Sequence, residues 1–168
     1  MSRIVVITGA TSGFGLAAAK KFHANGDTVI VASRNEEKVR RVVVENGFAD
    51  GVRIDVACYA DWLALRDHVK EKYGRIDVLV NNAGGGVRIA DTVEQTVEDI
   101  DAAIALNLNS TIYGCKLFGE MMKAQGDGIV INLASVCARH CWGGWSVYAA
   151  AKAGVLNFTK GFYVEMPP

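Results

Sequence analysis

The stretch Thr8–Gly15, which reads Thr-Gly-Ala-Thr-Ser-Gly-Phe-Gly, places three glycines between an apolar run and a segment with helical spacing. The run before it is Ile4–Thr8, and in the segment after it, Leu16–Asn25, apolar residues recur every three positions. Glycines let the backbone approach a ligand closely, and the first turn of a helix offers unpaired N–H groups to a phosphate. This order predicts a nucleotide pyrophosphate site, the alternative being a purely structural turn.

Apolar runs recur along the chain at a regular interval, beginning at positions 4, 28, 52 and 76, with a fifth after a longer gap. Each run is short, continuous and almost free of charge, which is typical of strands buried on both faces of a parallel sheet. Helical spacing between the runs, as in Asp61–Tyr73, predicts right-handed βαβ crossovers. The sequence therefore predicts an α/β fold, a three-layer α/β/α Rossmann-type doubly wound parallel sheet with strand order 3-2-1-4-5. The expected strands are Ile4–Thr8, Thr28–Ser33, Val52–Val56, Ile76–Asn81 and Gly128–Ala134.

The composition is that of a globular domain. The chain has 168 residues, 51% apolar and 21% charged, and this balance excludes disorder. Both prolines are the last two residues, so no proline-rich linker divides the chain, and we expect one nucleotide-binding domain over residues 1–168. Lys and Arg number 18, as do Asp and Glu, which argues against a nucleic acid or anionic membrane surface as partner. No run approaches the roughly 18 apolar residues of a membrane span.

The four cysteines, Cys58, Cys115, Cys137 and Cys141, form no Cys-x-x-Cys pair. We expect free thiols and a reducing, cytoplasmic location. Cys137, His140 and Cys141 could form a three-ligand metal cluster, but their spacing matches no common zinc pattern. The sequence therefore predicts no metal site.

Tyr148 is the one tyrosine among five that has a lysine, Lys152, four positions on. Residues at this spacing share a helix face, so both side chains can approach one ligand together. A nearby ammonium favours the phenolate form of tyrosine, which suits proton transfer near neutral pH. Ser135 ends the fifth apolar run, where ligands bind in open α/β sheets. Taken alone, Tyr148 and Lys152 could also be an ordinary surface pair.

Further motifs follow in a fixed order over essentially the whole chain: Asn81-Asn82-Ala83-Gly84, Asn107, Ser135 and Tyr148-x-x-x-Lys152. With the glycine-rich turn, they make the sequence resemble the short-chain dehydrogenases/reductases, whose loop reads Thr-Gly-x-x-x-Gly-x-Gly. The resemblance implies an oxidoreductase that transfers a hydride between a nicotinamide dinucleotide and a small-molecule carbonyl or secondary alcohol. It implies a catalytic role for Asn107, Ser135, Tyr148 and Lys152.

The family mechanism gives each of these four residues a task. Tyr148 exchanges a proton with the substrate oxygen, and Ser135 hydrogen-bonds that oxygen. Lys152 tunes Tyr148 and holds the nicotinamide ribose, while Asn107 positions a proton-relay water beside Lys152. His140 lies where the family places variable substrate-facing residues, so we do not expect it to be the catalytic base.

Two tryptophans, Trp142 and Trp145, flank the pair Gly143-Gly144 just before Tyr148. A bulky apolar wall over the substrate is one interpretation of this segment. Exposed aromatic residues at an oligomer contact are the other.

The residue that ends the second strand distinguishes the two nicotinamide cofactors. A carboxylate there binds the adenosine ribose of NAD and repels a 2′-phosphate, but this chain has Ser33 followed by Arg34. A guanidinium can bind a phosphate through two hydrogen bonds, and a serine hydroxyl can donate a third. We therefore expect NADP(H), the alternative being that Arg34 only begins a solvated helix.

The residues expected to bind the cofactor come from these motifs and, for Asp55, Val56, Asn82, Ala83 and Gly84, from the family resemblance. The full set is Gly9, Thr11, Ser12, Gly13, Phe14, Gly15, Ser33, Arg34, Asp55, Val56, Asn82, Ala83, Gly84, Tyr148 and Lys152.

The segment Thr92–Lys123 is apolar on nearly all sides and long enough for a helix of several turns. Such a helix packs on the sheet and on a second partner, although a covering loop is an equal alternative. The resemblance implies a homodimer in which this helix and Ser146–Glu165 form a four-helix bundle with the second subunit, and a homotetramer is a further possibility.

The family usually continues well beyond the Tyr-x-x-x-Lys helix with two further strands and a substrate lid. We expect this chain to be truncated after that helix, with Ile129–Leu133 as an edge strand. Two functions remain open: an NADP-dependent short-chain dehydrogenase/reductase, or a non-catalytic dinucleotide-binding remnant or fragment of a longer enzyme.

Overall fold

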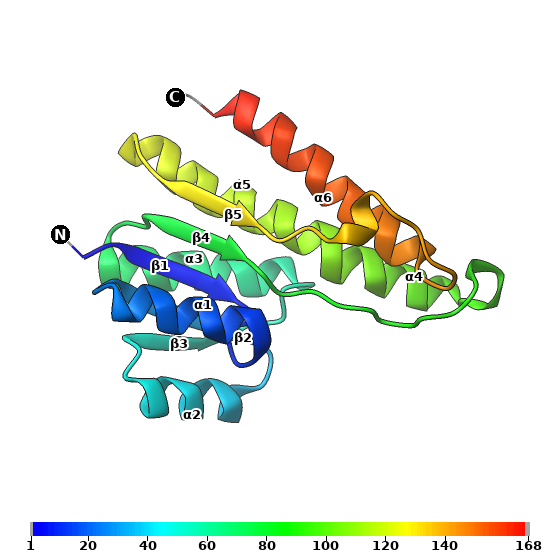
Figure 1. The fold of residues 1–168 in the computed structure, drawn as a ribbon. Coiled ribbons are helices and arrows are strands. Elements are labelled where there is room, and N and C mark those ends of the chain that lie inside the picture. The colour runs from blue at the N-terminus through cyan, green and yellow to red at the C-terminus, as the bar shows by residue number, and fades with distance from the viewer. Residues whose placement is uncertain (1, 167–168) are drawn as a thin grey trace.

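The computed structural model describes residues 2–166. Five parallel strands form one sheet in the order β3-β2-β1-β4-β5 (Figure 1). They are β1 (Ile4–Thr8), β2 (Thr28–Ser33), β3 (Asp50–Arg53), β4 (Val78–Asn81) and β5 (Ile129–Asn132). The predicted doubly wound fold and its strand order are confirmed.

Helices alternate with these strands along the chain. The α-helices are α1 (Gly13–Ala24), α2 (Glu36–Asn46), α3 (Tyr59–Tyr73), α4 (Val97–Ile104), α5 (Ser110–Gln125) and α6 (Ser146–Glu165). The 3₁₀ helices are η1 (Thr92–Glu94) and η3 (Val136–Ala138), and the π-helical segment is η2 (Ala105–Asn109). None of the helices between residues 2 and 166 combines the length and the apolar character that a membrane crossing needs.

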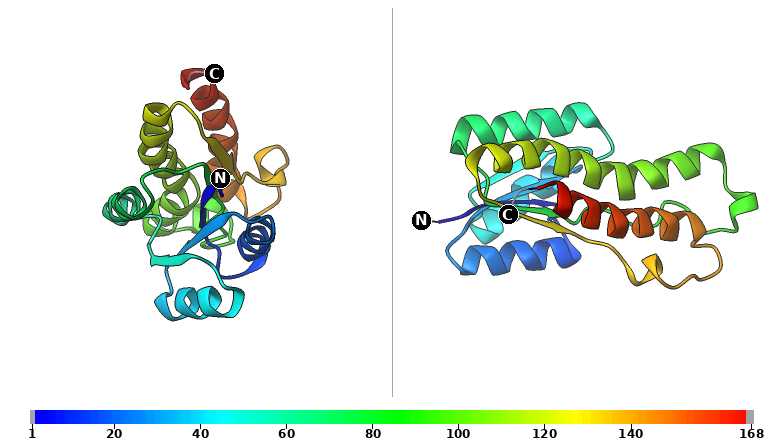
Figure 2. Two further views of the ribbon diagram at one scale, coloured as in Figure 1. Left: turned by 90° about the vertical axis from the view of Figure 1, so that its left-hand side faces the viewer. Right: turned by 90° about the horizontal axis from the view of Figure 1, so that it is seen from above.

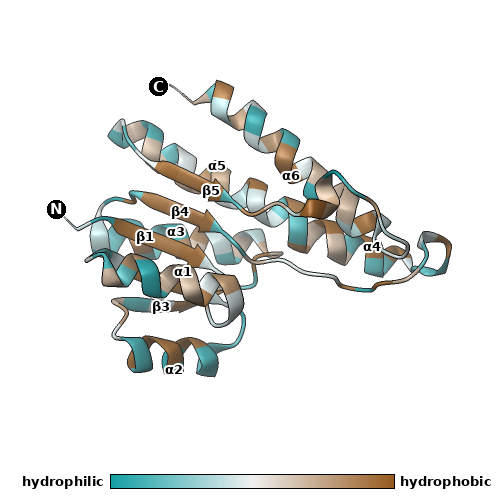
Figure 3. Cartoon of the chain, in the orientation of Figure 1, coloured by the Kyte–Doolittle hydropathy of each residue, from teal (hydrophilic) through white to brown (hydrophobic). Residues whose placement is uncertain are grey.

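Two apolar cores lie on the two faces of the sheet. One joins the sheet to α3 and α5 around Trp62, Leu117 and Phe118, and the other joins it to α1 and α2 around Ala19 and Val39. Figure 2 shows α3 and α5 on one side of the sheet and α1 on the other. Figure 3 shows that β1, β4 and β5 are largely apolar, whereas the helices are mixed. Burial on both faces therefore explains the nearly charge-free runs of the central strands.

The prediction of a strand over Val52–Val56 is wrong at both ends. After Ile54, whose N–H still bonds to β2, the backbone leaves the sheet, because the N–H of Asp55 donates to the Asp61 carboxylate at 2.8 Å. The side chains of Ile54 and Val56 remain buried in this turn. Their hydropathy therefore imitates a strand, and Asp55-Val56 follows β3 rather than closing it.

The predicted helix over Thr92–Lys123 is present, so the alternative of a covering loop is wrong, but the helix is interrupted. The segment begins with η1, and α4 then starts at a capping box in which Thr96 and Asp99 bond to each other's backbone N–H groups. The π-helical turn η2 separates α4 from α5. Such turns often accompany functional sites, and this one contains Asn107.

β5 is an edge strand, as predicted, and one of its faces is open. Ile129 and Ile131 on that face are 50% and 40% exposed. The other face meets α5, and α6 lies alongside it (Figure 2). β5 therefore has less apolar burial than β1, β2 or β4.

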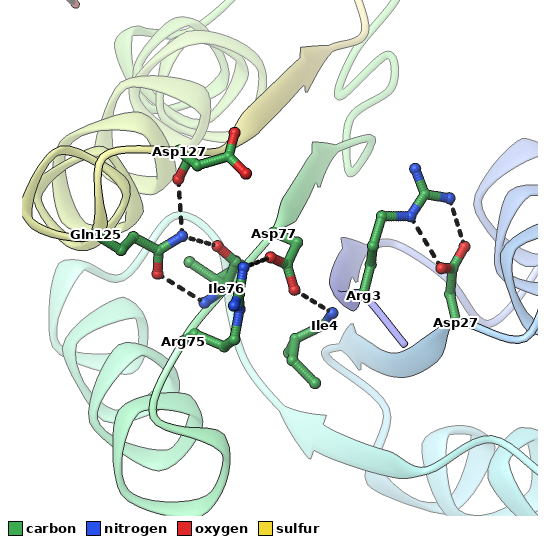
Figure 4. Close-up of polar contacts among 8 residues, drawn as sticks. All are labelled: Arg3, Ile4, Asp27, Arg75, Ile76, Asp77, Gln125 and Asp127. Carbon is green, nitrogen blue, oxygen red and sulfur yellow. Dashed lines mark hydrogen bonds and ion pairs between the residues drawn. The ribbon is translucent and has the colours of Figure 1, made fainter. Parts of the chain in front are cut away.

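Polar contacts join the strands at the amino edge of the sheet (Figure 4). The Asp77 carboxylate accepts from the N–H of Ile4 at 2.7 Å, which ties the start of β1 to the segment before β4. Arg3 binds Asp27 through two hydrogen bonds, and the Gln125 amide pairs with the backbone of Ile76. These contacts fix the edge of the sheet opposite the strand ends that carry the glycine-rich turn.

Helix α5 approaches β4 unusually closely at Gly114. A Cβ at this position would lie 2.5 Å from Asn81 Oδ1 and 2.7 Å from the Trp62 ring. The Asn81 amide is buried and donates to Asn132 on β5 at 2.8 Å and to the Cys115 sulfur at 3.5 Å. Burial raises the pKa of the Cys115 thiol to about 11. We call these contacts among Asn81, Asn132 and Cys115 the polar seam. Because residue 114 is glycine, α5 can pack closely against this seam.

We predict that Gly114→Ala lowers the free energy of unfolding by about 1–3 kcal/mol, because the new methyl group overpacks the seam. Gly161→Ala in α6 is the matched control, since a Cβ there meets nothing within 4 Å, and we expect it to raise stability by up to about 1 kcal/mol. Urea unfolding of both variants measures the difference. Equal effects of the two substitutions would contradict this account of the seam.

Candidate active site

A cavity of about 570 Å³ opens at the carboxyl ends of the five strands. Its walls come from the segments that directly follow each strand and from α6, which places sequence-distant motifs around one space. Of the residues expected at the site, those that line the cavity are Gly9, Thr11, Ser12, Phe14, Ser33, Arg34, Val56, Asn82, Ala83, Gly84, Ser135, Tyr148 and Lys152.

The glycine-rich turn forms one end of the cavity. Gly9 has a φ of +65°, and a Cβ there would lie 2.9 Å from the Cα of Ala83. Gly15 is buried against the Gly9 carbonyl, which a Cβ would meet at 2.4 Å, so it packs the turn rather than facing the cavity. Gly13 has a φ of +53° and open space around it. These three glycines therefore shape the turn in different ways.

The N-terminus of α1 has no capping side chain, since Ser12 makes no cap hydrogen bond and the first turn has no acidic residue. Helix α2, by contrast, is capped by the Asn35 side chain. The unpaired N–H groups of α1 and its positive dipole end therefore suit a phosphate at the cavity. The turn, the helix end and the cavity volume together fit a dinucleotide.

Thr8 and Asn82 join the ends of β1 and β4. The Thr8 hydroxyl accepts from the backbone N–H groups of Asn82 at 3.1 Å and Ala83 at 3.0 Å. The Asn82 side-chain amide donates to the carbonyls of Thr8 at 2.9 Å and Gly9 at 3.2 Å. The glycine turn and the segment after β4 are thereby fixed relative to each other. Asn82 thus serves the architecture of the cavity as well as its lining.

Ser33 and Arg34 lie at the end of β2, where they line the cavity. The Ser33 hydroxyl is 3.3 Å from the Thr11 hydroxyl, which links β2 to the glycine turn. Arg34 is exposed, and none of the ion pairs found within residues 2–166 involves it. Its guanidinium is therefore available to an anion beside Ser33.

Asp55 is not among the residues that line the cavity. Its carboxylate accepts from the N–H of Ala57 at 3.0 Å, which closes the turn after β3. The cavity wall here is formed by its neighbours Ile54 and Val56. Ile54 was missed by the sequence reasoning because it was assigned to the strand interior.

Asn107 is fully buried in the π-helical turn η2. Its Oδ1 accepts from the N–H of Gly85 at 2.9 Å, and its Nδ2 donates to the carbonyls of Gly85 at 2.9 Å and Ala103 at 3.0 Å. The side chain is therefore committed to the backbone of the glycine segment after β4. A Cβ on Gly84 would lie 2.8 Å from Asn107 Oδ1 and 3.1 Å from Lys152 Nζ. Glycine at position 84 therefore leaves room for both side chains beside the segment after β4.

Ser135, Tyr148 and Lys152 face the same cavity from the end of β5 and from α6. Lys152 Nζ lies 5.9 Å from the centroid of the Tyr148 ring and donates to the carbonyl of Leu133 at 2.9 Å. The Ser135 hydroxyl accepts from the N–H of Cys137 at the start of η3, which leaves its proton for a ligand. Leu133 was missed by the sequence reasoning, because a backbone acceptor has no side-chain signature.

The Lys152 side chain is almost completely buried, and burial lowers the pKa of its ammonium below the ordinary value of 10.5. Within residues 2–166, no carboxylate forms an ion pair with Lys152. The site therefore holds a cation at a cost in stability.

Three or more His, Cys, Asp or Glu side chains that could hold a metal ion do not come together anywhere in residues 2–166. Cys137 is buried while Cys141 is exposed, so the segment from 137 to 141 does not form the cluster considered above.

The family model described as short chain dehydrogenase matches residues 3–168. The chain belongs to the short-chain dehydrogenase family. Membership agrees with the parallel sheet and with the position of the Tyr-x-x-x-Lys pair beside the glycine-rich turn.

Individual relatives of this short-chain dehydrogenase support the same assignment. The 2-(R)-hydroxypropyl-CoM dehydrogenase of Xanthobacter autotrophicus is 38% identical over an alignment of 172 positions that covers 98% of this chain and 69% of the relative. A short-chain dehydrogenase/reductase from Burkholderia phymatum in complex with NAD is 30% identical, with a TM-score of 0.94 over 98% of this chain and 60% of that one. An actinorhodin polyketide ketoreductase with NADPH is 34% identical, with a TM-score of 0.92 over 98% of this chain and 65% of that one.

These relatives fix the class of chemistry but not its details. The chain spans between 60% and 69% of their lengths. One solved relative holds NAD and the other NADPH, so the family shows a nicotinamide dinucleotide and leaves the choice between the two to the residues of this short-chain dehydrogenase.

We predict that Lys152→Met raises the free energy of unfolding at pH 7 by about 1 kcal/mol, because it removes a buried cation. The pKa of Lys152 is lowered in the folded state, so between that lowered pKa and about 10.5 the unfolded chain binds more protons, and the stability of the unaltered protein rises with pH in that window. The advantage of Lys152→Met therefore shrinks as the pH approaches 10.5. Urea unfolding between pH 7 and 10 measures it.

The control for this prediction is Lys160→Met, which changes an exposed lysine of the same helix and is expected to leave stability unchanged. A Lys152→Met protein that is less stable than the unaltered protein at pH 7 would show that the bond to Leu133 outweighs the burial of charge.

Proposed function

We propose that the protein carrying this sequence is an NADP(H)-dependent oxidoreductase acting on a carbonyl or secondary alcohol of a small molecule. The observation that carries the proposal is that Ser135, Tyr148 and Lys152 open on the same cavity as the glycine-rich turn. The dinucleotide, when bound, supplies or accepts the hydride. The nearest chemistry among the relatives is that of dehydrogenases and a ketoreductase.

The residues of the site have separate tasks in this proposal. In the direction of reduction, Tyr148 donates the proton to the substrate oxygen, and Ser135 donates a hydrogen bond to it. The Lys152 ammonium lies 5.9 Å from the centre of the Tyr148 ring, where it would favour the phenolate, and Lys152 would hold the ribose hydroxyls of a dinucleotide in the cavity. Asn107 binds the backbone of Gly85 and thereby fixes the segment after β4. We propose that a proton-relay water binds beside Asn107 and Lys152.

The choice of NADP(H) rests on Ser33 and Arg34. An Asp or Glu at the end of β2 would repel a 2′-phosphate, and neither residue offers a carboxylate. The exposed guanidinium beside the Ser33 hydroxyl can instead donate several hydrogen bonds to that phosphate. The glycine-rich turn then binds the pyrophosphate, as its unpaired helix N–H groups suit.

We also propose that residues 1–168 form a single nucleotide-binding domain that works without a metal and without nucleic acid or membrane partners.

We propose a reducing, cytoplasmic location for the protein. The four cysteines are free thiols, which supports this location.

We predict that Tyr148→Phe lowers the rate of NADPH-dependent ketone reduction by about 10²–10⁴-fold, because it deletes the proton donor. NADPH binding should stay within a few-fold, since the ring and its packing remain. Absorbance at the nicotinamide band gives the rate, and fluorescence titration gives the affinity. Tyr163→Phe, an exposed tyrosine of the same helix, is the control and should keep both values. A Tyr148→Phe protein with the unaltered rate would contradict the assignment of the proton donor.

We predict that Arg34→Ala weakens NADPH binding by about tenfold to more than a hundredfold, the equivalent of losing about 1.5–3 kcal/mol of charged hydrogen bonding. NADH affinity should change little, because NADH lacks the 2′-phosphate. Arg41→Ala removes an exposed arginine farther along α2 and controls for the general loss of positive charge. If the unaltered protein binds both cofactors equally well, Arg34 is not the determinant.

We further propose that two copies associate through α4, α5 and α6 as a four-helix bundle. Val97 on α4 and Tyr163 and Val164 on α6 are apolar or aromatic side chains more than 60% exposed in the single chain. Sedimentation at micromolar concentration is expected to give twice the 18.0 kDa of one chain, and Val164→Asp should shift it toward the monomer. A monomer for the unaltered chain would contradict this association, and a tetramer would require a second contact surface.

A further inference from the structure

The ring of Tyr148 has a neighbour besides the Lys152 ammonium, and this neighbour is aromatic. Trp145, immediately before α6, packs edge-to-face on it, with ring centroids 5.3 Å apart and planes inclined by 72°. This is the geometry that aromatic pairs prefer, and it restricts how the phenol can tilt. Lys152 Nζ lies 5.9 Å from the centre of the same ring. The orientation of the proposed proton donor thus depends on a side chain outside the Ser-Tyr-Lys set.

Trp145 is itself held by the backbone. Its N–H donates to the carbonyl of Trp142 at 3.2 Å, and its carbonyl accepts from the N–H of Ala149 at 2.8 Å, which joins a tight turn to the first turn of α6. Gly144 in this turn has a φ of +78°, and a Cβ there would lie 3.3 Å from Ile89 Cγ2. The turn therefore needs glycine at 144 and packs against the segment after β4.

The indole also reaches the glycine segment that follows β4. A Cβ on Gly86 would lie 3.6 Å from the Trp145 ring and 2.6 Å from Ile89 Cδ1, whereas a Cβ on Gly85 would meet nothing within 4 Å. The side chains of Trp145 and Ile89 thus both lie against the backbone of the glycine segment at Gly86. The surroundings of Gly85 are therefore open to another group.

The side chains around this space are apolar. Ile89 is 47% exposed and Trp142, in the same turn as Trp145, is 51% exposed, which is high for large apolar groups. Arg88, the basic residue of the segment between β4 and α4, pairs with Asp99 of α4 at 3.1 Å. The exposed surface beside Tyr148 therefore favours an apolar group over a charged one.

We propose that Trp145 is the positioning residue for Tyr148 and, with Ile89, forms the wall that takes an aromatic or other flat apolar substituent of the substrate carbonyl compound. The proposal rests on the proposed function for the role of Tyr148. It assigns the substrate class: a ketone or secondary alcohol that carries a flat apolar group on one side.

The first test measures the contact without turnover. In the full chain with labelled tyrosine side chains, Tyr148→Phe identifies the Tyr148 ring signals in an NMR spectrum. The indole of Trp145 should shift these signals, so Trp145→Ala should move them toward ordinary values while Trp145→Phe keeps part of the shift. Tyr113→Ala removes a similar edge-to-face pair with Tyr59, with centroids 5.1 Å apart, and should leave the Tyr148 signals in place. Unmoved Tyr148 signals in Trp145→Ala would overturn the positioning role.

The second test compares two probes, acetophenone and 2-butanone, with NADPH. We expect Trp145→Ala to lower kcat for both about tenfold or more, because the donor is misplaced. The ratio of kcat/KM for acetophenone to that for 2-butanone should fall a further two- to tenfold, since one aromatic contact is lost. Trp145→Phe should keep the rates and the ratio within about threefold of the unaltered protein. A merely structural effect, as in Tyr113→Ala, scales both probes equally and leaves the ratio unchanged.

The failure of this proposal and that of the proposed function give different results. If the unaltered chain reduces neither probe, the proposed function fails, and the wall is then tested by adding acetophenone with NADP⁺ and following the three tryptophan indole N–H signals. Movement of the Trp145 signal beyond that of the buried Trp62 supports the wall. A stationary Trp145 signal, or an unchanged probe ratio in Trp145→Ala, overturns it.

Discussion

The contact between Thr8 and Asn82 is the constraint on which the cavity depends. Parallel strands β1 and β4 are adjacent in space but separated by about seventy residues of chain, and their ends could diverge as the sheet twists. The Thr8 hydroxyl and the Asn82 amide bond each other's backbone in both directions, so the glycine turn and the segment after β4 move as one unit. Gly9 and Gly15 permit this approach because neither carries a Cβ.

From this junction the rest of the site follows by short steps. The segment after β4 continues to Gly85, whose backbone is bonded on both sides by the buried Asn107 amide. Asn107 lies in the π-helical turn between α4 and α5. Gly84 then leaves room for Lys152 Nζ beside Asn107. Polar contacts and the short segment from Asn82 to Gly85 thus link the glycine turn to the surroundings of Lys152.

The cost of this arrangement is concentrated at Lys152. Its ammonium is buried without a carboxylate partner, and burial lowers its pKa, yet it keeps one acceptor in the Leu133 carbonyl. A buried cation of this kind is unfavourable for folding. In the function proposed above, this cation binds ribose hydroxyls and assists the proton transfer, so stability and the proposed function make opposite demands on Lys152.

The sequence alone determined the sheet and most of its elements, because burial on both faces leaves long apolar, charge-free runs in β1, β2 and β4 that no other environment requires. The sequence also showed the glycine turn, the Tyr-x-x-x-Lys spacing and Ser135, because each of them is a local pattern. β3 was misplaced because Ile54 and Val56 are buried in a turn, and hydropathy does not distinguish a buried turn from a strand. The interruption at η2, the acceptor role of the Leu133 carbonyl and the packing of Trp145 on Tyr148 were decided only by tertiary structure. Each of these depends on backbone groups or side chains that meet across distant segments, and such contacts leave no periodic mark in the chain.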